Sequence, residues 1–284
     1  MPIDPDKLVA LAFPDIEQSY SEKDVMLYAL GVGLGADPLD RRELAFVYEK
    51  NLKVLPTFAV VLGFDPFLLR DYDTGVDYTL AVHGEEHLTL HTLPAPSGTV
   101  VAQHRICDVI DKGAGKGALL LMERVIFDKA SGTPIATIRQ SVFCRGDGGF
   151  GDVRPSPPAH PVPDRAPDQV CDLTTRPEMA LIYRLSADTN PLHCDPDVAR
   201  AAGFPRPILQ GLGTFGVAGH ALLRTLCDYD PSRLRGMSGR FTAPVFPGET
   251  IRIEMWRDGD VISYRARVVE RDVVAINNGR AEVN

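Results

Sequence analysis

Cysteine is scarce in this sequence. Five cysteines are spread over 284 residues, and none of them belongs to a Cys-x-x-Cys pair. A disulfide framework or a structural zinc site requires clustered cysteines, so this set is typical of free thiols. We therefore expect a protein of the cytoplasm that binds no metal.

Long apolar runs are missing as well. No stretch approaches the roughly 18 apolar residues that a membrane span requires. The opening residues, MPIDPDKLVALAF, lack the basic start and the continuous apolar core of a secretion signal. With 44% hydrophobic and 24% charged residues, the composition is that of a soluble globular protein, and we expect no membrane partner.

Positive charge is neither abundant nor clustered. Thirty lysines and arginines stand against 38 acidic residues, which gives a net charge of −8. Without a basic stretch interleaved with aromatic residues, the sequence predicts no nucleic-acid partner. The stretch GLGTFG lacks the surrounding βαβ pattern of a nucleotide-binding loop, so we also expect no redox cofactor.

Glycine and proline are concentrated in one region. Residues 145–170 read RGDGGFGDVRPSPPAHPVPDRAPDQV, a composition typical of an extended linker. We predict an N-terminal domain over residues 1–145, a linker over 146–170 and a C-terminal domain over 171–284.

The two halves share a sequence pattern. YALGVG at 28–33 precedes LPTFAVV at 55–61, and YRLSAD at 183–188 precedes LGTFGVA at 212–218. Similar segments in the same order predict a duplicated fold.

Strand and helix signals support that prediction. The period-two alternation of half-buried antiparallel strands is strongest at 251–255 and 262–268, and 99–111, 117–128 and 133–143 look similar. By contrast, Thr214–Leu226 is apolar on nearly every face. A helix of this kind must be buried, and a curved sheet can enclose it. We predict an α+β fold in which a sheet wraps a helix, twice.

The loop YRLSADTNPLHCDP, residues 183–196, contains Asp188, Asn190 and His193. A short helix expected to start at Pro196 would order this loop. A carboxylate and an imidazole that converge can hold one water molecule and move protons at neutral pH. Alternatively, the acid and the amide only initiate turns and the histidine is an ordinary loop residue.

Twenty residues later comes PILQGLGTFG, residues 207–216. A glycine turn that enters a buried helix presents unpaired N–H groups at the positive end of the helix dipole. The amide of Gly211 therefore suits a developing oxyanion, although the glycines can equally serve close packing. Together the two segments predict chemistry next to a carbonyl group.

The stretch YRLSADTNPLHCDPDVARAAGFPRPILQGLGTFG resembles the hydratase 2 signature of the MaoC-like, double-hotdog enoyl-CoA hydratases, a family that includes the hydratase part of the peroxisomal multifunctional enzyme. Further similar stretches are DVMLYALGVG, VLPTF, HGEEHLTL, DKGAGKG, RFTAPVFPGETI and EMW. The resemblance implies a double hotdog with two antiparallel sheets, each wrapped around a buried helix. It also implies a homodimer that hydrates trans-2-enoyl-CoA to (3R)-3-hydroxyacyl-CoA without a cofactor, the CoA thioester being the substrate.

The same resemblance implies a site. Asp188 and His193 would activate water, Asn190 would orient the site, and the Gly211 amide would polarise the thioester carbonyl. The implied substrate contacts are His83, Gly84, Lys112, Thr189, Pro191, Leu192 and Phe241. Lys112 suits a CoA phosphate but also a solvated turn, and the phenyl ring also suits the core.

The sequence departs from the family pattern in three places. Ala187 stands where glycine is common, Thr189 where tryptophan is common, and Gln210 where histidine is common. None of these changes removes the acid and the base. The small Thr189 beside the catalytic acid favours a wider pocket for a branched or ring-bearing acyl group.

Two rival functions remain at this stage. A hotdog thioesterase would direct the water to the carbonyl carbon, and an acyl-CoA or acyl-carrier binding module would not react at all. Aligning the two halves places Gly33 opposite Asp188 and Pro38 opposite His193, so the first half lacks both side chains. We expect one active site per chain.

Overall fold

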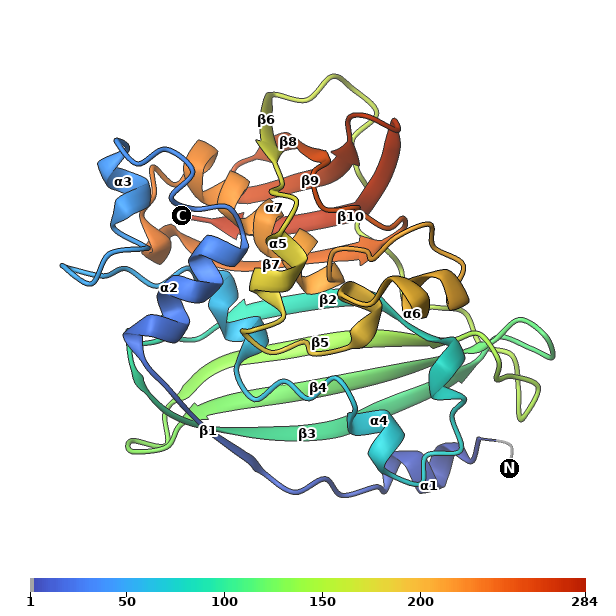
Figure 1. The fold of residues 1–284 in the computed structure, drawn as a ribbon. Helices are drawn as coiled ribbons and strands as arrows, with labels where there is room; N and C mark the ends of the chain where they lie inside the picture. The colour runs from blue at the N-terminus through green and yellow to red at the C-terminus, as the bar shows by residue number, and fades with distance from the viewer. Residues whose placement is uncertain (1–2) are drawn as a thin grey trace.

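The computed structural model describes residues 3–284, which form one continuous sheet of ten antiparallel strands (Figure 1). The strand order is β1-β3-β4-β5-β2-β7-β10-β9-β8-β6. The strands are β1 (Ile16–Tyr20), β2 (Ala81–Leu90), β3 (Gly98–Asp111), β4 (Ala118–Asp128), β5 (Pro134–Cys144), β6 (Gln169–Thr174), β7 (Leu234–Phe241), β8 (Thr250–Asp258), β9 (Val261–Val268) and β10 (Val273–Val283). The five stretches predicted as strands correspond to β3, β4, β5, β8 and β9, so those predictions are confirmed.

Helical segments connect the strands. They are α1 (Pro5–Val9), α2 (Glu22–Gly31), α3 (Arg41–Leu44), η1 (Pro56–Val61), α4 (Leu68–Asp71), η2 (Tyr78–Leu80), α5 (Met179–Tyr183), η3 (Pro191–His193), α6 (Pro196–Ala201), α7 (Gly211–Leu226) and η4 (Pro231–Arg233). The short helix predicted after the loop is confirmed as α6, and the Asp195 carboxylate caps it by accepting the N–H of Asp197 at 2.8 Å.

The long helix α7 lies inside the sheet, as its apolar sequence predicts. Thirteen of its 16 residues are buried, and it packs against β6, β7, β8 and β10. A Cβ atom on Gly216 would lie 2.5 Å from a methyl group of Val32, and one on Gly219 would lie 2.6 Å from the methyl group of Thr57. These two glycines therefore let segments of the first half approach the helix closely.

The first half contains a much shorter counterpart of α7. Where the duplication predicts a second buried helix, the chain forms η1, six residues of 3-10 helix that start at Pro56. Gly63, with a φ of +59°, then turns the chain so tightly against β3 that a Cβ atom there would lie 2.2 Å from the Cβ of Ala102. β2 pairs with β7, so the two units share one sheet, as a double hotdog in one chain leads us to expect.

Equivalent residues of the two halves meet at the centre of the molecule. Tyr28 on α2 and Tyr183 on α5 are both fully buried, and their ring centroids are 5.8 Å apart. The two helices lie side by side (Figure 1), and a Cβ atom on Gly31 would lie 3.4 Å from the Cα of Tyr183. This arrangement is what a duplicated sequence leads us to expect.

The segment 146–170 is mostly exposed; it first follows the β3–β4 hairpin, where the Arg154 N–H donates to the carbonyl of Asp111 at 3.1 Å, and then crosses to the second half. The His160 imidazole is 2.8 Å from the Ser263 hydroxyl on β9, and the Asn278 side chain on β10 donates to the carbonyl of His160 at 2.8 Å. The segment is thus held against the sheet by a few polar contacts. The domain limits at 145 and 171 stay a prediction, although β6 already begins at residue 169.

All five cysteines have free thiols, and Cys144, Cys171 and Cys227 are buried. Burial raises the pKa of the Cys144 thiol to about 12 and that of Cys227 to about 11. These thiols are therefore protonated near neutral pH and pack as small apolar groups.

Asp111 joins the hairpin between β3 and β4 to the glycine-rich segment that follows β5. Its carboxylate accepts backbone N–H groups from Gly113, Gly149, Phe150 and Gly151 at 2.6 to 2.8 Å. These hydrogen bonds favour the ionised form and lower the pKa of Asp111 to about 2.

We expect Asp111→Ala to lower Tm at neutral pH, because four N–H groups lose their acceptor. Because the pKa is depressed in the folded state, the contribution of Asp111 is present above the pKa of the unfolded chain and is lost as the pH falls toward about 2. Thermal unfolding of both proteins should show a Tm difference that shrinks between pH 4 and pH 2. A difference that does not change with pH would contradict this account.

Candidate active site

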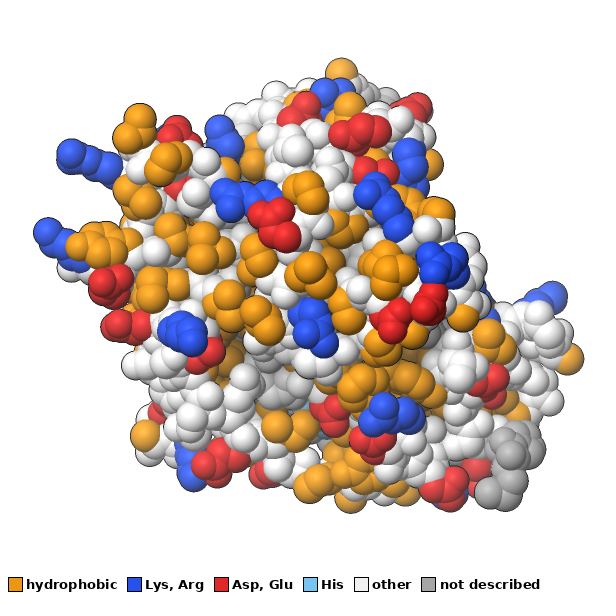
Figure 2. Space-filling model, in the orientation of Figure 1, with side chains coloured by type: hydrophobic (Ala, Val, Ile, Leu, Met, Phe, Trp, Pro, Cys, Tyr) orange, Lys and Arg blue, Asp and Glu red, His pale blue; other side chains and the backbone are white. Residues whose placement is uncertain are grey.

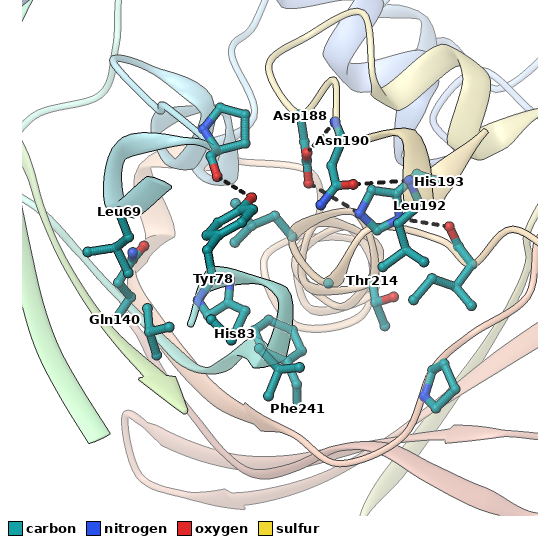
Figure 3. A pocket seen from close by; sticks show the side chains of 18 of the residues that line it. Leu69, Tyr78, His83, Gln140, Asp188, Asn190, Leu192, His193, Thr214 and Phe241 are labelled. Carbon is teal, nitrogen blue, oxygen red and sulfur yellow. Dashed lines mark hydrogen bonds and ion pairs between the residues drawn. The ribbon is translucent and has the colours of Figure 1, made fainter. Parts of the chain in front are cut away.

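A cavity of about 740 Å³ is lined by both halves of the chain. The first half contributes side chains of β3, β4, β5, α4 and η2, and the second half contributes the 188–193 loop and the start of α7. Figure 3 shows Asp188 and His193 on one side of this cavity and Leu69 and Gln140 on the other. Residues far apart in the sequence therefore share one site.

The loop holds its acid by consecutive turns. One oxygen of Asp188 accepts the N–H of Asn190 at 3.1 Å, and the Asn190 side chain accepts the N–H of Leu192 at 3.0 Å. Asp188 and Asn190 therefore do initiate turns, as the alternative to a catalytic role predicted. They occupy only Oδ1 of the aspartate, and its second oxygen points toward the histidine (Figure 3).

His193 is oriented by the backbone. Its Nδ1 lies 2.9 Å from the carbonyl oxygen of Ile208, and its Nε2 lies 3.4 Å from Oδ2 of Asp188. Because a carbonyl only accepts hydrogen bonds, Nδ1 carries a proton, and in the neutral ring Nε2 has a free lone pair. The side chains are 8% and 14% exposed, so the pair faces the cavity rather than bulk solvent.

This geometry suits a water molecule. An ionised carboxylate and an unprotonated Nε2 are both acceptors, so they do not bond each other directly. A water between them can donate one hydrogen to each, which orients a lone pair of its oxygen toward a substrate. The sequence-based expectation that Asp188 and His193 converge therefore agrees with the structure.

The start of α7 supplies the donor. Gly211 is the first residue of the helix and lines the cavity, and the first intrahelical bond runs from the Thr214 N–H to the carbonyl of Gln210 at 3.0 Å. Within residues 3–284, no acceptor pairs with the N–H groups of residues 211–213. These amides sit at the positive end of a 16-residue helix and can stabilise negative charge in the cavity.

A bulge in β2 positions His83. The pairing of β2 with β5 slips between His83 and Glu85, and a Cβ atom on Gly84 would lie 2.7 Å from the hydroxyl of Ser141. His83 then faces the cavity, with its ring centroid 4.9 Å from that of Phe241. A side chain at position 84 would displace the Ser141 hydroxyl and lie tightly against the Ser141 carbonyl oxygen, 3.3 Å from its Cβ, so Gly84 contributes through the backbone shape of the bulge.

Of the predicted substrate contacts, His83, Leu192 and Phe241 line the cavity, whereas Gly84, Lys112, Thr189 and Pro191 do not. Thr189 is exposed, and so is Pro191. The expectation that Thr189 widens the acyl pocket is therefore corrected, because its side chain points to solvent. The Lys112 ammonium donates to the carbonyl of Arg154 at 3.1 Å and to the hydroxyl of Ser156 at 2.9 Å.

Two family models match the chain. The MFE-2 hydratase 2 N-terminal domain matches residues 18–146, and the MaoC like domain matches residues 158–279. A relative from Arabidopsis thaliana, named peroxisomal enoyl-CoA hydratase 2, is 39% identical. The alignment is 290 positions long and covers 94% of this chain and 91% of the relative. This chain belongs to the MaoC-like hydratase 2 family.

Other members of this family are similarly close. An enoyl-CoA hydratase of Mycobacterium tuberculosis is 37% identical over an alignment of 285 positions, which covers 98% of each chain. Among solved structures, a MaoC-like dehydratase of Phytophthora capsici has a TM-score of 0.85 at 30% identity, over 98% of both chains. A Mycobacterium tuberculosis protein described as a double hotdog has a TM-score of 0.57 at 15% identity, over 100% of this chain and 96% of that one. The predicted double hotdog is thereby confirmed.

The structure adds residues to this hydratase 2 site that sequence reasoning missed. Tyr78, His104, Arg124 and Gln140 line the cavity. Burial, then the charge of Asp188, raises the pKa of Tyr78, whose hydroxyl donates to the carbonyl of Pro66 at 2.8 Å. The three strand residues had a visible signal, since each is a polar residue in the inward-facing row of an otherwise apolar strand.

No group of three possible metal-binding side chains occurs within residues 3–284. In the same part of the chain, no helix has the length and apolar character to cross a membrane.

Proposed function

We propose that this protein hydrates trans-2-enoyl-CoA thioesters to (3R)-3-hydroxyacyl-CoA, within fatty-acid β-oxidation or a related acyl-CoA pathway. The observation that carries the proposal is the convergence of three elements on one cavity: Asp188, His193 and the amide of Gly211. Similarity to relatives named enoyl-CoA hydratases supports the same reaction.

The reaction can be written so that each proton has a place. The water donates hydrogen bonds to Asp188 and to Nε2 of His193, and its oxygen bonds to the β-carbon while Nε2 takes one proton. Electrons of the double bond move to the thioester oxygen, which the Gly211 N–H stabilises. Nε2 then returns the proton to the α-carbon, and the enzyme regains its starting state. No cofactor takes part in this sequence, and the CoA thioester is the substrate.

Incubation with crotonyl-CoA tests the proposal. We expect the absorbance of the conjugated thioester to fall while no free thiol appears, because water adds to the β-carbon and the thioester survives. Release of free CoA would instead favour the thioesterase, in which the same water attacks the carbonyl carbon. Binding of the CoA thioester without either reaction would favour the acyl-CoA or acyl-carrier binding module.

The CoA end of the substrate is proposed to lie at the rim near the hairpin between β3 and β4. Arg145, at the end of β5, lines the cavity and is exposed. The hairpin that carries Lys112 packs on this end, since a Cβ atom on Gly117 would lie 2.8 Å from the carbonyl oxygen of Cys144. Two cations beside one opening suit the phosphates of CoA.

We expect Lys112→Ala and Arg145→Ala each to raise KM for CoA thioesters several-fold while kcat changes little. A phosphate contact remote from the reacting carbons stabilises substrate and transition state equally. Lys129→Ala is the matched control, because Lys129 lies at the opposite hairpin and pairs with Glu17. An unchanged KM in both variants would place the CoA phosphates elsewhere.

The assembly is proposed to be a homodimer formed through the face that carries α2 and α5. Figure 2 shows hydrophobic side chains gathered there, and Leu30, Leu181 and Leu185 are 38%, 52% and 63% exposed. Exposed apolar patches commonly mark protein interfaces. We expect the wild type to sediment as a dimer and Leu185→Glu to sediment as a monomer.

The proposed location is the cytoplasm, in keeping with the free thiols.

A further inference from the structure

One wall of the cavity is polar where an apolar acyl chain would require hydrocarbon side chains. His104 on β3, Arg124 on β4 and Gln140 on β5 all face the cavity. His104 pairs directly with Arg124 across the strands, and Gln140 is two residues from Ile138, the partner of Arg124 on β5. The three side chains therefore form a contiguous polar row on one face of the sheet.

The Gln140 end of this row lies away from the reacting groups. Figure 3 shows Gln140 beside Leu69, across the cavity from His193 and with Tyr78 between the two sides. We infer that the acyl chain of a thioester held by Asp188 and Gly211 extends toward this wall, so that Gln140 lies beside the chain and away from the reacting carbons.

Arg124 has hydrogen-bonding capacity to spare. Its side chain is almost fully buried, one terminal N–H donates to the carbonyl of Val60 at 2.6 Å, and its Nε has no partner within residues 3–284. Burial lowers the pKa of Arg124 to about 10, against the opposing charge of Glu86, so the guanidinium remains protonated at neutral pH. Nε is sealed from the cavity, whereas the other terminal nitrogen, Nη1, is not among the sealed atoms and has no acceptor within residues 3–284, so it can donate to a ligand.

The two flanking side chains are also incompletely used. The His104 ring is 2.9 Å from the carbonyl of Gly63, so Nε2 carries the proton and Nδ1 can accept. Burial and the charge of Arg124 lower the pKa of His104 to about 4, which keeps the ring neutral. Within residues 3–284 the Gln140 amide donates only to the sulfur of Met122, at 3.7 Å, and thioethers are weak acceptors.

The charge near this row is already balanced. Glu86 on β2 is fully buried, and its carboxylate lies 3.0 Å from Nε2 of His83. The negative charge of Glu86 also stabilises the positive charge of Arg124. A second carboxylate supplied by a ligand would therefore bring an uncompensated negative charge into a buried site. A neutral oxygen, which accepts hydrogen bonds without adding charge, fits better.

We propose that the physiological acyl group carries a neutral oxygen, as a ketone or a hydroxyl, remote from the thioester, and that Arg124 and Gln140 donate hydrogen bonds to it. This inference rests on the proposed hydration of enoyl-CoA and assigns its substrate class. The enzyme then selects oxygenated acyl chains over plain hydrocarbon chains, since a plain chain would leave buried donors unpaired.

The test compares trans-2-decenoyl-CoA with oxo derivatives that carry a ketone at successive carbons of the distal half. We expect the best oxo derivative to exceed the parent in kcat/KM by about tenfold, the size of one or two good hydrogen bonds. Gln140→Leu should reduce this ratio by about fivefold. Because Arg124 also holds the Val60 carbonyl, Arg124→Met probes folding as well, so Gln140→Leu is the decisive variant.

The matched control is Gln103→Leu. Gln103 is exposed on the outer face of β3, where its amide donates to Asp15 at 3.2 Å, so the same exchange there should leave both the rate and the ratio unchanged. If no oxo derivative is preferred, or if the preference persists in Gln140→Leu, the inference is overturned. A stronger preference for a terminal carboxylate would overturn the neutral assignment. Failure to hydrate crotonyl-CoA would instead contradict the proposed function.

Discussion

His193→Ala and Asp188→Asn are each expected to lower kcat for enoyl-CoA hydration by about two orders of magnitude or more, with the fold intact. The first change removes the base that takes and returns the proton, and the second removes the charge that holds the water. Asp188→Asn keeps an oxygen that can still accept the N–H of Asn190, so the turn survives. Steady-state rates with crotonyl-CoA, together with Tm, measure both effects.

Matched controls separate chemistry from general damage. His91 and Asp197 are exposed, and the same substitutions there, His91→Ala and Asp197→Asn, should leave kcat unchanged. Near-normal turnover in either His193→Ala or Asp188→Asn would remove that residue from the mechanism. A loss of activity in a variant whose Tm also falls far below that of the wild type would indicate a structural role instead.

Gly216→Val is expected to destabilise the protein by about 3 kcal/mol, toward the upper end of overpacking effects. A Cβ atom at this position would lie 2.5 Å from Val32 and 2.9 Å from the hydroxyl of Tyr28, so the helix inside the sheet and the first half must separate. A loss of this size lowers Tm by roughly 5 to 10 °C in a protein of this length. Thermal and denaturant unfolding measure it.

Gly151→Ala is the control for that prediction. No atom lies within 4 Å of a Cβ built on Gly151, and its φ lies outside the positive range, so this substitution should leave Tm within a degree or two. Equal stability of Gly216→Val and the wild type would contradict the close packing of α7 on the first half. The packing of the two hotdog units would then tolerate more rearrangement than the structure implies.

Much of the fold follows from local pattern. Alternating residues predicted β8 and β9, and the all-apolar stretch with Gly216 predicted a helix inside the sheet. That the two units share a sheet was predicted, but the strands that join them were not, because β2 and β7 are about 150 residues apart in the sequence. The shortness of η1 also follows from tertiary packing, since Gly63 lies directly against Ala102.

The site was predictable where one segment carried it. Asp188, Asn190 and His193 lie within six residues, and their turns bring them together locally. The far wall of the cavity was not predictable, because Arg124 and Gln140 come from separate strands. The pairing register of β4 with β5 brings them close together, and the sequence does not reveal that register. The prediction for Thr189 was wrong because neighbouring residues on this loop point in opposite directions, one to the cavity and one to solvent.

The most direct test of the account is the stereochemistry of hydration in D₂O. The proton that leaves the water and the proton that reaches the α-carbon both pass through Nε2 of His193, on the side of the substrate where Asp188 holds the water. We therefore predict that oxygen and deuterium add to the same face of crotonyl-CoA, giving a (3R) product of a single relative configuration that NMR can assign. Addition to opposite faces would require a second proton donor across the cavity and would contradict the mechanism.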